Sequence, residues 1–204
     1  MSNGYEKESY VKHDAYHASK VLDFQRKHQT LTAVERWGKY VTGKIVDVGA
    51  NYGGITMIIA ERESVESAVA VDIFPGVRKR YKDVLATINP EVAKKMSLLI
   101  ANVLDLHEHF EEESVDTVAC FHTLEHFYED DVPEAIRQMV GIIKSGGHLI
   151  VAVPNERAHN DKTHETYWTL ERLITTVEVC GSVKHVDSYV DEHSCINALF
   201  AKEN

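Results

Sequence analysis

A glycine-containing loop that follows a β-branched run is the feature that most restricts how this chain can fold. Residues 44–48 (KIVDV) lead into Gly49 and Gly53, and an apolar segment of helical length follows. Gly49 allows a sharp turn off a buried strand, and Gly53 allows backbone to approach a ligand without a Cβ in the way. The pattern predicts a nucleotide-type cofactor site, although a tight strand-to-helix turn without a ligand would use glycine similarly.

An acidic residue after a second apolar run supports the cofactor interpretation. Residues 68–71 (AVAV) end in Asp72, about twenty residues beyond the glycine loop, where a carboxylate can accept hydrogen bonds from both ribose hydroxyls. Asp47 lies just before the loop. An acid there would repel a pyrophosphate, so this position favours a cationic ligand over a dinucleotide.

With these residues the sequence resembles the class I S-adenosylmethionine-dependent methyltransferases. Their first motif is similar to Asp/Glu-x-Gly-x-Gly-x-Gly, and Asn51 stands where the middle glycine is usual, as in some members with an Asp-Val-Gly-Ala-Asn loop. The resemblance implies that Asp47 and Gly49 lie near the methionine part of the cofactor. It also implies that Asp72 holds the ribose and that Ile73 packs on the adenine.

Later segments resemble further motifs of the same family, in order, over residues 44–173. Residues 97–106 are similar to the third strand and its turn, in which Asn102 would meet the adenine amino group, and residues 144–155 are similar to the glycine turn and fifth strand. The resemblance implies S-adenosylmethionine as cofactor and S-adenosylhomocysteine as product. The implied cofactor-binding residues are Asp47, Gly49, Asn51, Gly53, Asp72, Ile73, Asn102, Val103 and Phe121.

Alternating strand and helix patterns define the expected fold. Helical patterns fall near residues 54–62, 77–88, 132–143 and 169–179, with strands between them. Such alternation predicts a parallel sheet covered on both faces, while the runs 182–190 and 194–201 are joined too closely to be parallel. We therefore expect an α/β, Rossmann-like three-layer sandwich: a mostly parallel seven-stranded sheet with the last strand antiparallel.

Two regions are expected along the chain. Residues 1–43 form an N-terminal helical segment, with helix over 23–40 and the earlier part as a candidate lid over the cofactor mouth. Residues 44–204 form the S-adenosylmethionine-binding methyltransferase domain. A length of 204 residues, with 44% hydrophobic and 26% charged residues, suits one soluble domain.

Composition also bears on location and partners. The three cysteines show no metal-type spacing, no apolar run approaches the ~20 residues that cross a bilayer, and residues 1–12 are too polar for a signal peptide. We expect a cytoplasmic protein without a membrane segment. The net charge of -10 would repel a polyanion, so we expect a small-molecule acceptor, such as a sugar or metabolite, in preference to nucleic acid.

Histidines dominate the candidate catalytic residues. Ligands of open α/β sheets bind outside the carboxyl ends of the strands, which places His122, Glu125 and His126 beside the methyl group to be transferred. This segment resembles the family's "hxLEH" segment, and residues 164–173 resemble its "H-x-x-x-(W/F)-(T/S)-x-x-x-L" segment, so His164 is the first candidate for substrate contact or base. A histidine suits proton removal from a hydroxyl or amine. Alternatively, Glu125 and His126 only orient a loop through hydrogen bonds.

Several other functions remain open. Glu125, His126 and His164 match three of the four metal ligands in the small-RNA 2′-O-methyltransferase family, with His122 in place of the first Glu, so a metal-assisted RNA methyltransferase is one alternative to an unmetallated histidine cluster. A cofactor-binding member without turnover and a nicotinamide-dependent dehydrogenase on the same fold are others. The chain lacks the Asn/Asp-Pro-Pro-Tyr/Phe segment of nucleobase amino-methyltransferases and a Pro-Cys nucleophile.

Overall fold

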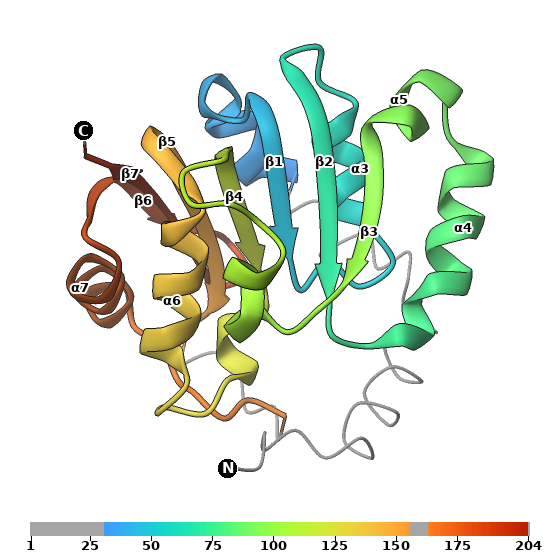
Figure 1. Cartoon of the computed structure of the whole chain (residues 1–204). Helices are drawn as coiled ribbons and strands as arrows, with labels where there is room; N and C mark the ends of the chain where they lie inside the picture. Colours follow the sequence, from blue (N-terminus) through green and yellow to red (C-terminus); the bar gives the residue numbers. More distant parts are fainter. Residues whose placement is uncertain (1–30, 156–162, 204) are drawn as a thin grey trace.

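A single twisted sheet organises the molecule (Figure 1). The computed structural model describes residues 31–155 and 163–203. The strand order is β3-β2-β1-β4-β5-β7-β6, in which β1 to β5 are parallel and β7 runs antiparallel to both β5 and β6. The strands are β1 (Gly43–Val48), β2 (Val65–Asp72), β3 (Met96–Ile100), β4 (Val115–Phe121), β5 (Ile143–Pro154), β6 (Val183–Val190) and β7 (Cys195–Lys202). The predicted sheet is thus confirmed.

The helices also follow the predicted pattern, with one addition. They are α3 (Gly54–Ala60), α4 (Arg78–Thr87), α5 (Pro90–Lys95), α6 (Val132–Gly141) and α7 (Leu170–Gly181), with short 3-10 turns η1 (Gly38–Tyr40), η2 (Pro75–Val77), η3 (Val103–Glu108) and η4 (Leu124–His126). We did not predict α5. Its signal is the Asn89-Pro90 pair, because the Asn89 side chain accepts a hydrogen bond from the Glu91 N–H while Pro90 fixes the first helical residue.

Hydrophobic side chains fill both faces of the sheet, as three layers require. Successive residues of β1 point to opposite faces, so Val46 belongs to the core cluster that contains Ile136 of α6 and Leu173 of α7. Ile45 belongs to the other cluster, together with Ile59 of α3. Figure 1 shows α6 and α7 on the near face of the sheet and α3 on the far face.

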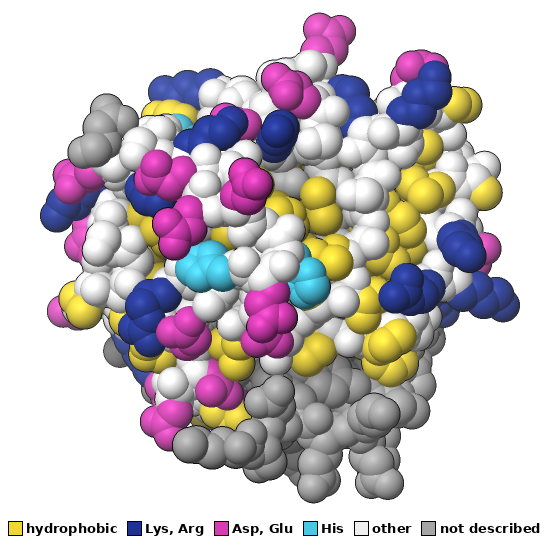
Figure 2. All heavy atoms as spheres, in the orientation of Figure 1, with side chains coloured by type: hydrophobic (Ala, Val, Ile, Leu, Met, Phe, Trp, Pro, Cys, Tyr) yellow, Lys and Arg dark blue, Asp and Glu magenta, His cyan; other side chains and the backbone are white. Residues whose placement is uncertain are grey.

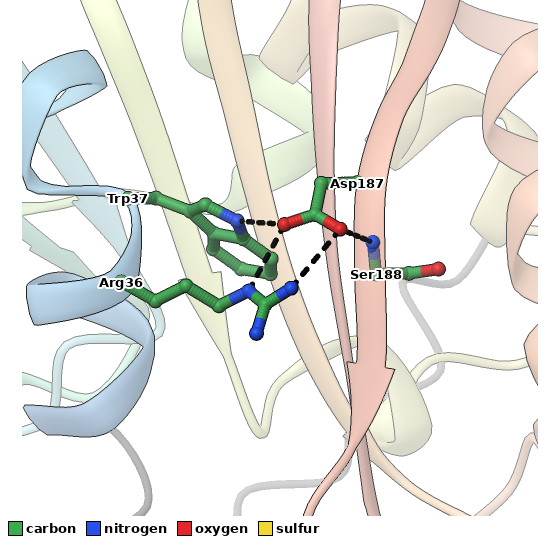
Figure 3. A network of polar contacts seen from close by, with 4 residues as sticks. All are labelled: Arg36, Trp37, Asp187 and Ser188. Atoms are coloured by element: carbon green, nitrogen blue, oxygen red, sulfur yellow. Dashed lines mark hydrogen bonds and ion pairs between the residues drawn. The ribbon is translucent and has the colours of Figure 1, made fainter.

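The first described helix contacts β6, the edge strand next to β7. Residues 31–36 are helical. Arg36 Nε and Trp37 Nε1 each donate to Asp187 Oδ2 of β6 over 2.9 Å, and Asp187 Oδ1 accepts from the Ser188 N–H (Figure 3). The hydrogen bonds from Arg36 and then Trp37 lower the pKa of Asp187 to about 2. The lid predicted for the earlier N-terminal part falls on residues 1–30, outside the described residues.

Strand register brings the predicted site residues to the carboxyl ends of the parallel strands, at one end of the sheet. Val48 pairs with Val71 of β2 and with Cys120 of β4, and Asp72 pairs with Ile100 of β3. The segments after these four strands therefore leave the sheet at the same end. In the described part of the chain, no helix is long and apolar enough to cross a membrane.

Candidate active site

Gly49 is required by the close approach of two loops. Its φ is +69°, and a Cβ at this position would lie 2.1 Å from Thr123 Oγ1. The Thr123 hydroxyl lies within hydrogen-bond distance of the Val48 and Phe121 carbonyl oxygens, at 3.2 and 3.1 Å. The β1 loop and the β4 loop are thus held together through Thr123, a residue that the motif analysis did not single out.

The rest of the loop explains the departure from the usual glycine pattern. Asn51 has φ +52°, and asparagine is one of the few residues with a side chain that adopt this conformation readily. Gly53 precedes α3 with φ +82°. A Cβ on Gly53 would meet the Tyr81 ring at 2.9 Å, so this glycine accommodates Tyr81 of α4 as well as the turn.

Asp72 fixes the backbone of two neighbouring segments, the glycine loop after β1 and the residues that follow β2. Its Oδ2 accepts the Asn51 N–H over 2.7 Å, and its Oδ1 accepts the Phe74 N–H over 2.9 Å. Each carboxylate oxygen can accept more than one hydrogen bond, so these bonds are compatible with an additional ribose contact. The acid therefore orders the glycine loop and the segment after β2 together.

Asp47 is a buried acid behind the same loop. It is 1% exposed, and its Oδ2 accepts the Thr56 hydroxyl over 2.6 Å. Burial raises the pKa of Asp47 to about 7, with Thr56 opposing this shift and the Asp72 charge adding to it. A cation beside Asp47 would favour its ionised form. We did not predict a role for Thr56 from the sequence. Its signal is a lone hydroxyl in the otherwise apolar helix after the loop.

The residues predicted for the adenine side lie next to these acids. The Ala101 N–H donates to the Asp72 carbonyl oxygen, which places Asn102 close to the end of β2. Asn102 Oδ1 accepts the Leu104 N–H over 3.1 Å and so caps η3. Ile73 is partly exposed, whereas Val103 and Phe121 are buried. Their contacts with a cofactor stay predictions.

His122 begins the segment after β4, which we call the acceptor side because the candidate acceptor-binding histidines were predicted there, and its backbone is left-handed. Its φ is +52°, and its N–H donates to the Ala152 carbonyl oxygen of β5 over 2.8 Å. His122 Nδ1 lies 3.6 Å from Glu125 Oε1. Non-glycine residues in this conformation persist where surrounding contacts enforce it, and they cluster at functional sites.

Glu125 is the most deeply buried charge of the acceptor side. It is 1% exposed, and its Oε2 has no hydrogen-bond partner among the described residues. Burial alone would raise the pKa of Glu125, but the nearby imidazoles of His122 and His126 outweigh it and hold that pKa below its usual value. A carboxylate oxygen with unused bonding capacity therefore lies inside the site.

The segment that leads into α7 packs against the segment after β4, and it carries His164, the remaining predicted histidine. The Glu165 and Thr166 N–H groups donate to the Glu125 carbonyl oxygen over 2.9 and 3.1 Å. His126 Nδ1 lies 3.0 Å from the Thr163 carbonyl oxygen, which assigns the ring proton to Nδ1. The His126 and His164 rings are nearly perpendicular, with centroids 5.3 Å apart. The structure thus brings all three predicted histidines and Glu125 to the same side of the site.

One subset of these residues has the composition of a metal site. Glu125, His126 and His164 each offer a ligand atom, and the three atoms lie within 4.8 Å of one another. One carboxylate and two imidazoles suit several divalent transition metals. His122 does not belong to this group, although the sequence places it in the position of a fourth ligand.

Sheet order, glycine loop and paired acids define a cofactor-binding α/β protein of the methyltransferase type. The family model described as "Methyltransferase domain" matches residues 46–151. The chain belongs to this family, among the class I S-adenosylmethionine-dependent methyltransferases.

Similar proteins include methyltransferases of different kinds. Phosphoethanolamine N-methyltransferase 1 of Triticum aestivum is 24% identical over 162 residues, which are 78% of this chain, and the chain spans only 31% of that relative. The N-methyltransferase NodS of Bradyrhizobium japonicum, solved with S-adenosylhomocysteine, has a TM-score of 0.67 at 17% identity, covering 88% of this chain and 87% of its own.

A further similar chain comes from the complex of the Haloferax volcanii Trm112 methyltransferase activator with a putative methyltransferase. Its TM-score is 0.75 at 16% identity, and the match covers 94% of this chain and 96% of that one. At such identities the structural matches establish the fold, and they do not identify an acceptor.

Proposed function

We propose that this chain transfers the methyl group of S-adenosylmethionine to an oxygen or nitrogen nucleophile of a small molecule in the cytoplasm. One observation carries the proposal. The glycine loop after β1 and the histidine segment after β4 lie at the same end of the sheet and contact each other through Thr123. A cofactor and an acceptor held at this end would meet, and aligning the two reactants is the main requirement of an in-line displacement.

The residues of the glycine-loop side fit this cofactor chemically. S-adenosylmethionine supplies an electrophilic methyl group on a positively charged sulfonium, and it carries a ribose with two hydroxyls. Asp72 would hold the ribose, and the buried Asp47 would favour the positive charge. Ile73, Asn102 and Val103 would form the adenine side.

The histidines supply proton transfer on the acceptor side. An alcohol or ammonium acceptor must lose a proton as its new bond to carbon forms, and imidazole is well suited to take that proton at neutral pH. His122, His126 and His164 are the candidates, and His164 is the first because it comes from the separate segment that packs over Glu125.

The small-molecule assignment has two supports. The net charge of -10 disfavours a polyanionic partner. Two of the similar proteins, the wheat relative and NodS, are N-methyltransferases, and the wheat relative is named for a small amine acceptor.

Calorimetric titration of the metal-stripped protein with S-adenosylmethionine and S-adenosylhomocysteine tests the proposal. We expect micromolar binding of both. Asp72→Ala should weaken it by roughly 1.5 to 3 kcal/mol, because a charge-assisted hydrogen bond to ribose is lost. Asp83→Ala, an exposed acid on α4, is the matched control and should bind normally. Binding of NAD without S-adenosylhomocysteine would identify a dehydrogenase instead, and binding of neither would indicate a fold member without turnover.

A metal-assisted 2′-O-methyltransferase-like function is the second candidate. It is favoured by the Glu125, His126 and His164 group and by Glu125 Oε2, which has no hydrogen-bond partner in the described part of the chain. The test is Mn²⁺ titration of the stripped protein, followed by electron paramagnetic resonance and calorimetry, with His164→Ala as the variant and exposed His109→Ala as the control. Stoichiometric Mn²⁺ binding lost only in His164→Ala would support this candidate. Absence of binding would remove it.

A further inference from the structure

We propose that the acceptor of this site is a cationic amine that carries no phosphate or carboxylate close to its nitrogen. The proposal rests on the proposed methyltransferase function and narrows it to one substrate class. It is carried by the acidic rim of the acceptor side, a buried carboxylate oxygen without a partner, and two exposed tyrosines on adjoining segments.

Two segments form the walls of the acceptor side. One is 122–131, which follows β4, and the other is 163–171, which leads into α7. Besides the bonds to the Glu125 carbonyl oxygen, the Thr166 hydroxyl donates to the Phe127 carbonyl oxygen over 2.5 Å. These bonds hold the two walls in a fixed relation, so their charges act on the same space.

The charges on these walls have one sign. Among the described residues of the two segments there is no Lys or Arg, whereas the acids are Glu125, Glu129, Asp130, Asp131, Glu165 and Glu171. Arg172 comes next along the chain, but its guanidinium pairs with Glu129 and also donates to the Tyr167 carbonyl oxygen. Figure 2 shows Asp and Glu side chains gathered over the lower end of α6 and the loop that leads into it. A negative potential attracts cations to such a site and disfavours anions.

Glu125 makes this a binding site as well as an acidic surface. Its side chain is 2% exposed, its Oε1 lies 3.6 Å from His122 Nδ1, and its Oε2 has no partner among the described residues. A buried acceptor without a donor is costly, so a ligand that supplies an N–H to Oε2 would relieve that cost. A charged N–H gives the stronger form of this bond.

Two tyrosines suit the methylated forms of the same ligand. Tyr128 is 42% exposed and Tyr167 is 43% exposed, and each directly follows one partner of the Phe127–Thr166 hydrogen bond. The aromatic face attracts an ammonium or methylammonium group. Exposed aromatic side chains on the same two segments as a buried carboxylate are the composition that suits an amine and its methylated product.

The chemical step has a consequence for the product. The ammonium gives its proton to an imidazole, and its nitrogen forms a bond to the methyl carbon while the bond from that carbon to sulfur breaks and leaves its electron pair on sulfur. The methylated amine can take up a proton again and remain cationic. The same site therefore retains affinity for its product, and repeated methylation of one nitrogen is expected.

The test compares the binding of a cationic probe with that of a neutral probe of the same shape and that of a probe that also carries a phosphate. The full chain, saturated with S-adenosylhomocysteine in EDTA, is titrated with choline, with its neutral carbon analogue 3,3-dimethyl-1-butanol, and with phosphocholine. S-adenosylhomocysteine has no methyl group to transfer, so binding is read without turnover, by calorimetry or saturation-transfer NMR. We expect choline to bind at least about tenfold more tightly than either of the other probes.

Charge variants locate the effect. Choline carries a permanent positive charge but no N–H, so Glu125→Gln should weaken its binding about tenfold by removing the buried negative charge, while S-adenosylhomocysteine binding and the circular dichroism spectrum are retained. Glu165→Gln, an exposed change on the rim, should have a smaller effect and keeps the test valid if Glu125→Gln fails to fold. Glu66→Gln removes the same charge from an exposed position on β2 and should change nothing.

Without added metal, three results would overturn the inference. These are equal binding of the neutral analogue, tighter binding of phosphocholine, and no binding of choline to a protein that binds S-adenosylhomocysteine. Choline binding that appears only after Mn²⁺ is added would also overturn it, because a metal would then occupy Glu125. Failure to bind S-adenosylhomocysteine at all would instead reject the proposed function on which the inference rests.

Discussion

The two sides of the candidate site differ in how completely the chain satisfies its own polar groups. On the cofactor side, both Asp72 oxygens accept backbone N–H groups and Asp47 accepts the Thr56 hydroxyl. On the acceptor side, Glu125 Oε2 has no partner among the described residues, and His122 is held in a left-handed conformation. The cofactor side is therefore preformed by internal hydrogen bonds, whereas the acceptor side keeps bonding capacity for a ligand.

This difference predicts separable effects of mutation. Changes on the preformed side should alter cofactor affinity and folding together, since the same bonds serve both. Changes on the acceptor side should alter turnover while cofactor affinity and stability are retained.

The largest expected effect is on turnover in His164→Ala. Loss of a positioned base reduces rate by roughly 10²- to 10⁴-fold. S-adenosylhomocysteine affinity should stay near that of the wild type, because His164 belongs to the acceptor side. Single-turnover kinetics with any amine found to be methylated, combined with calorimetry, separates the two quantities. A large loss of cofactor affinity would end the proposed division into two sides.

Gly49→Ala should lower the free energy of unfolding by about 3 kcal/mol, because the alanine would strain the left-handed backbone and clash with Thr123 on the preformed side. Chemical denaturation measures the loss in the free energy of unfolding, and cofactor titration should show a parallel loss. Gly54→Ala is the matched control: this glycine is helical, a Cβ would meet nothing closer than 3.4 Å, and a gain of roughly 0.5 to 1 kcal/mol is expected. Equal behaviour of the two variants would contradict the argument.

The raised pKa of Asp47 predicts proton-linked cofactor binding. Its folded value of about 7 lies above the ordinary value of 3.8, so the stability that it contributes is full below about pH 4 and is lost as pH rises through 7. A cationic cofactor favours the ionised form, so binding should release a proton near pH 6. Affinity should fall by up to about tenfold per pH unit below 7.

Calorimetry in buffers of different ionisation enthalpy measures that release. Asp47→Asn should abolish both the buffer dependence and the pH dependence of cofactor affinity. Persistence of proton release in this variant would assign it to another group.

The smallest expected effect lies outside both sides, at Asp187. Asp187→Asn should lower the free energy of unfolding by only roughly 0.5 to 1 kcal/mol at pH 7, because the Arg36 pair is partly exposed and screened by solvent. Since the pKa of Asp187 is lowered to about 2, its contribution is present above about pH 4 and is lost as pH falls toward 2. Denaturation curves at pH 7 and pH 2.5 test this, and cofactor affinity should not change.

The preformed side was also the more predictable from sequence. Strand patterns and the glycine loop are local signals, so the sheet, Gly49 and Asp72 could be located without coordinates. Thr123 could not be recognised as a partner of Gly49, because their proximity depends on the pairing of β1 with β4. Asn51 was noted as a departure, and its left-handed backbone gives the reason that asparagine replaces glycine there.

The acceptor side depends on long-range contacts that no local pattern records. His164 reaches Glu125 only because the Glu165 and Thr166 N–H groups bond to the Glu125 carbonyl oxygen. The absence of a partner for Glu125 Oε2 is a property of the packed structure, and neither spacing nor composition reveals it. The acids of segment 122–131 are neighbours in the sequence, whereas their position next to segment 163–171 depends on the fold.

The position of β7 has a consequence for how the chain folds. Among the described strands, β6 pairs only with β7, and β7 lies between β5 and β6, so Cys195–Lys202 alone joins β6 to the rest of the sheet. Without β7, the parallel part of the sheet would end in an open edge on β5 and β6 would be unpaired, and unpaired edges promote association between molecules. Pairing of β7 with both neighbours thus completes the sheet and covers the β5 edge, on which molecules would otherwise associate.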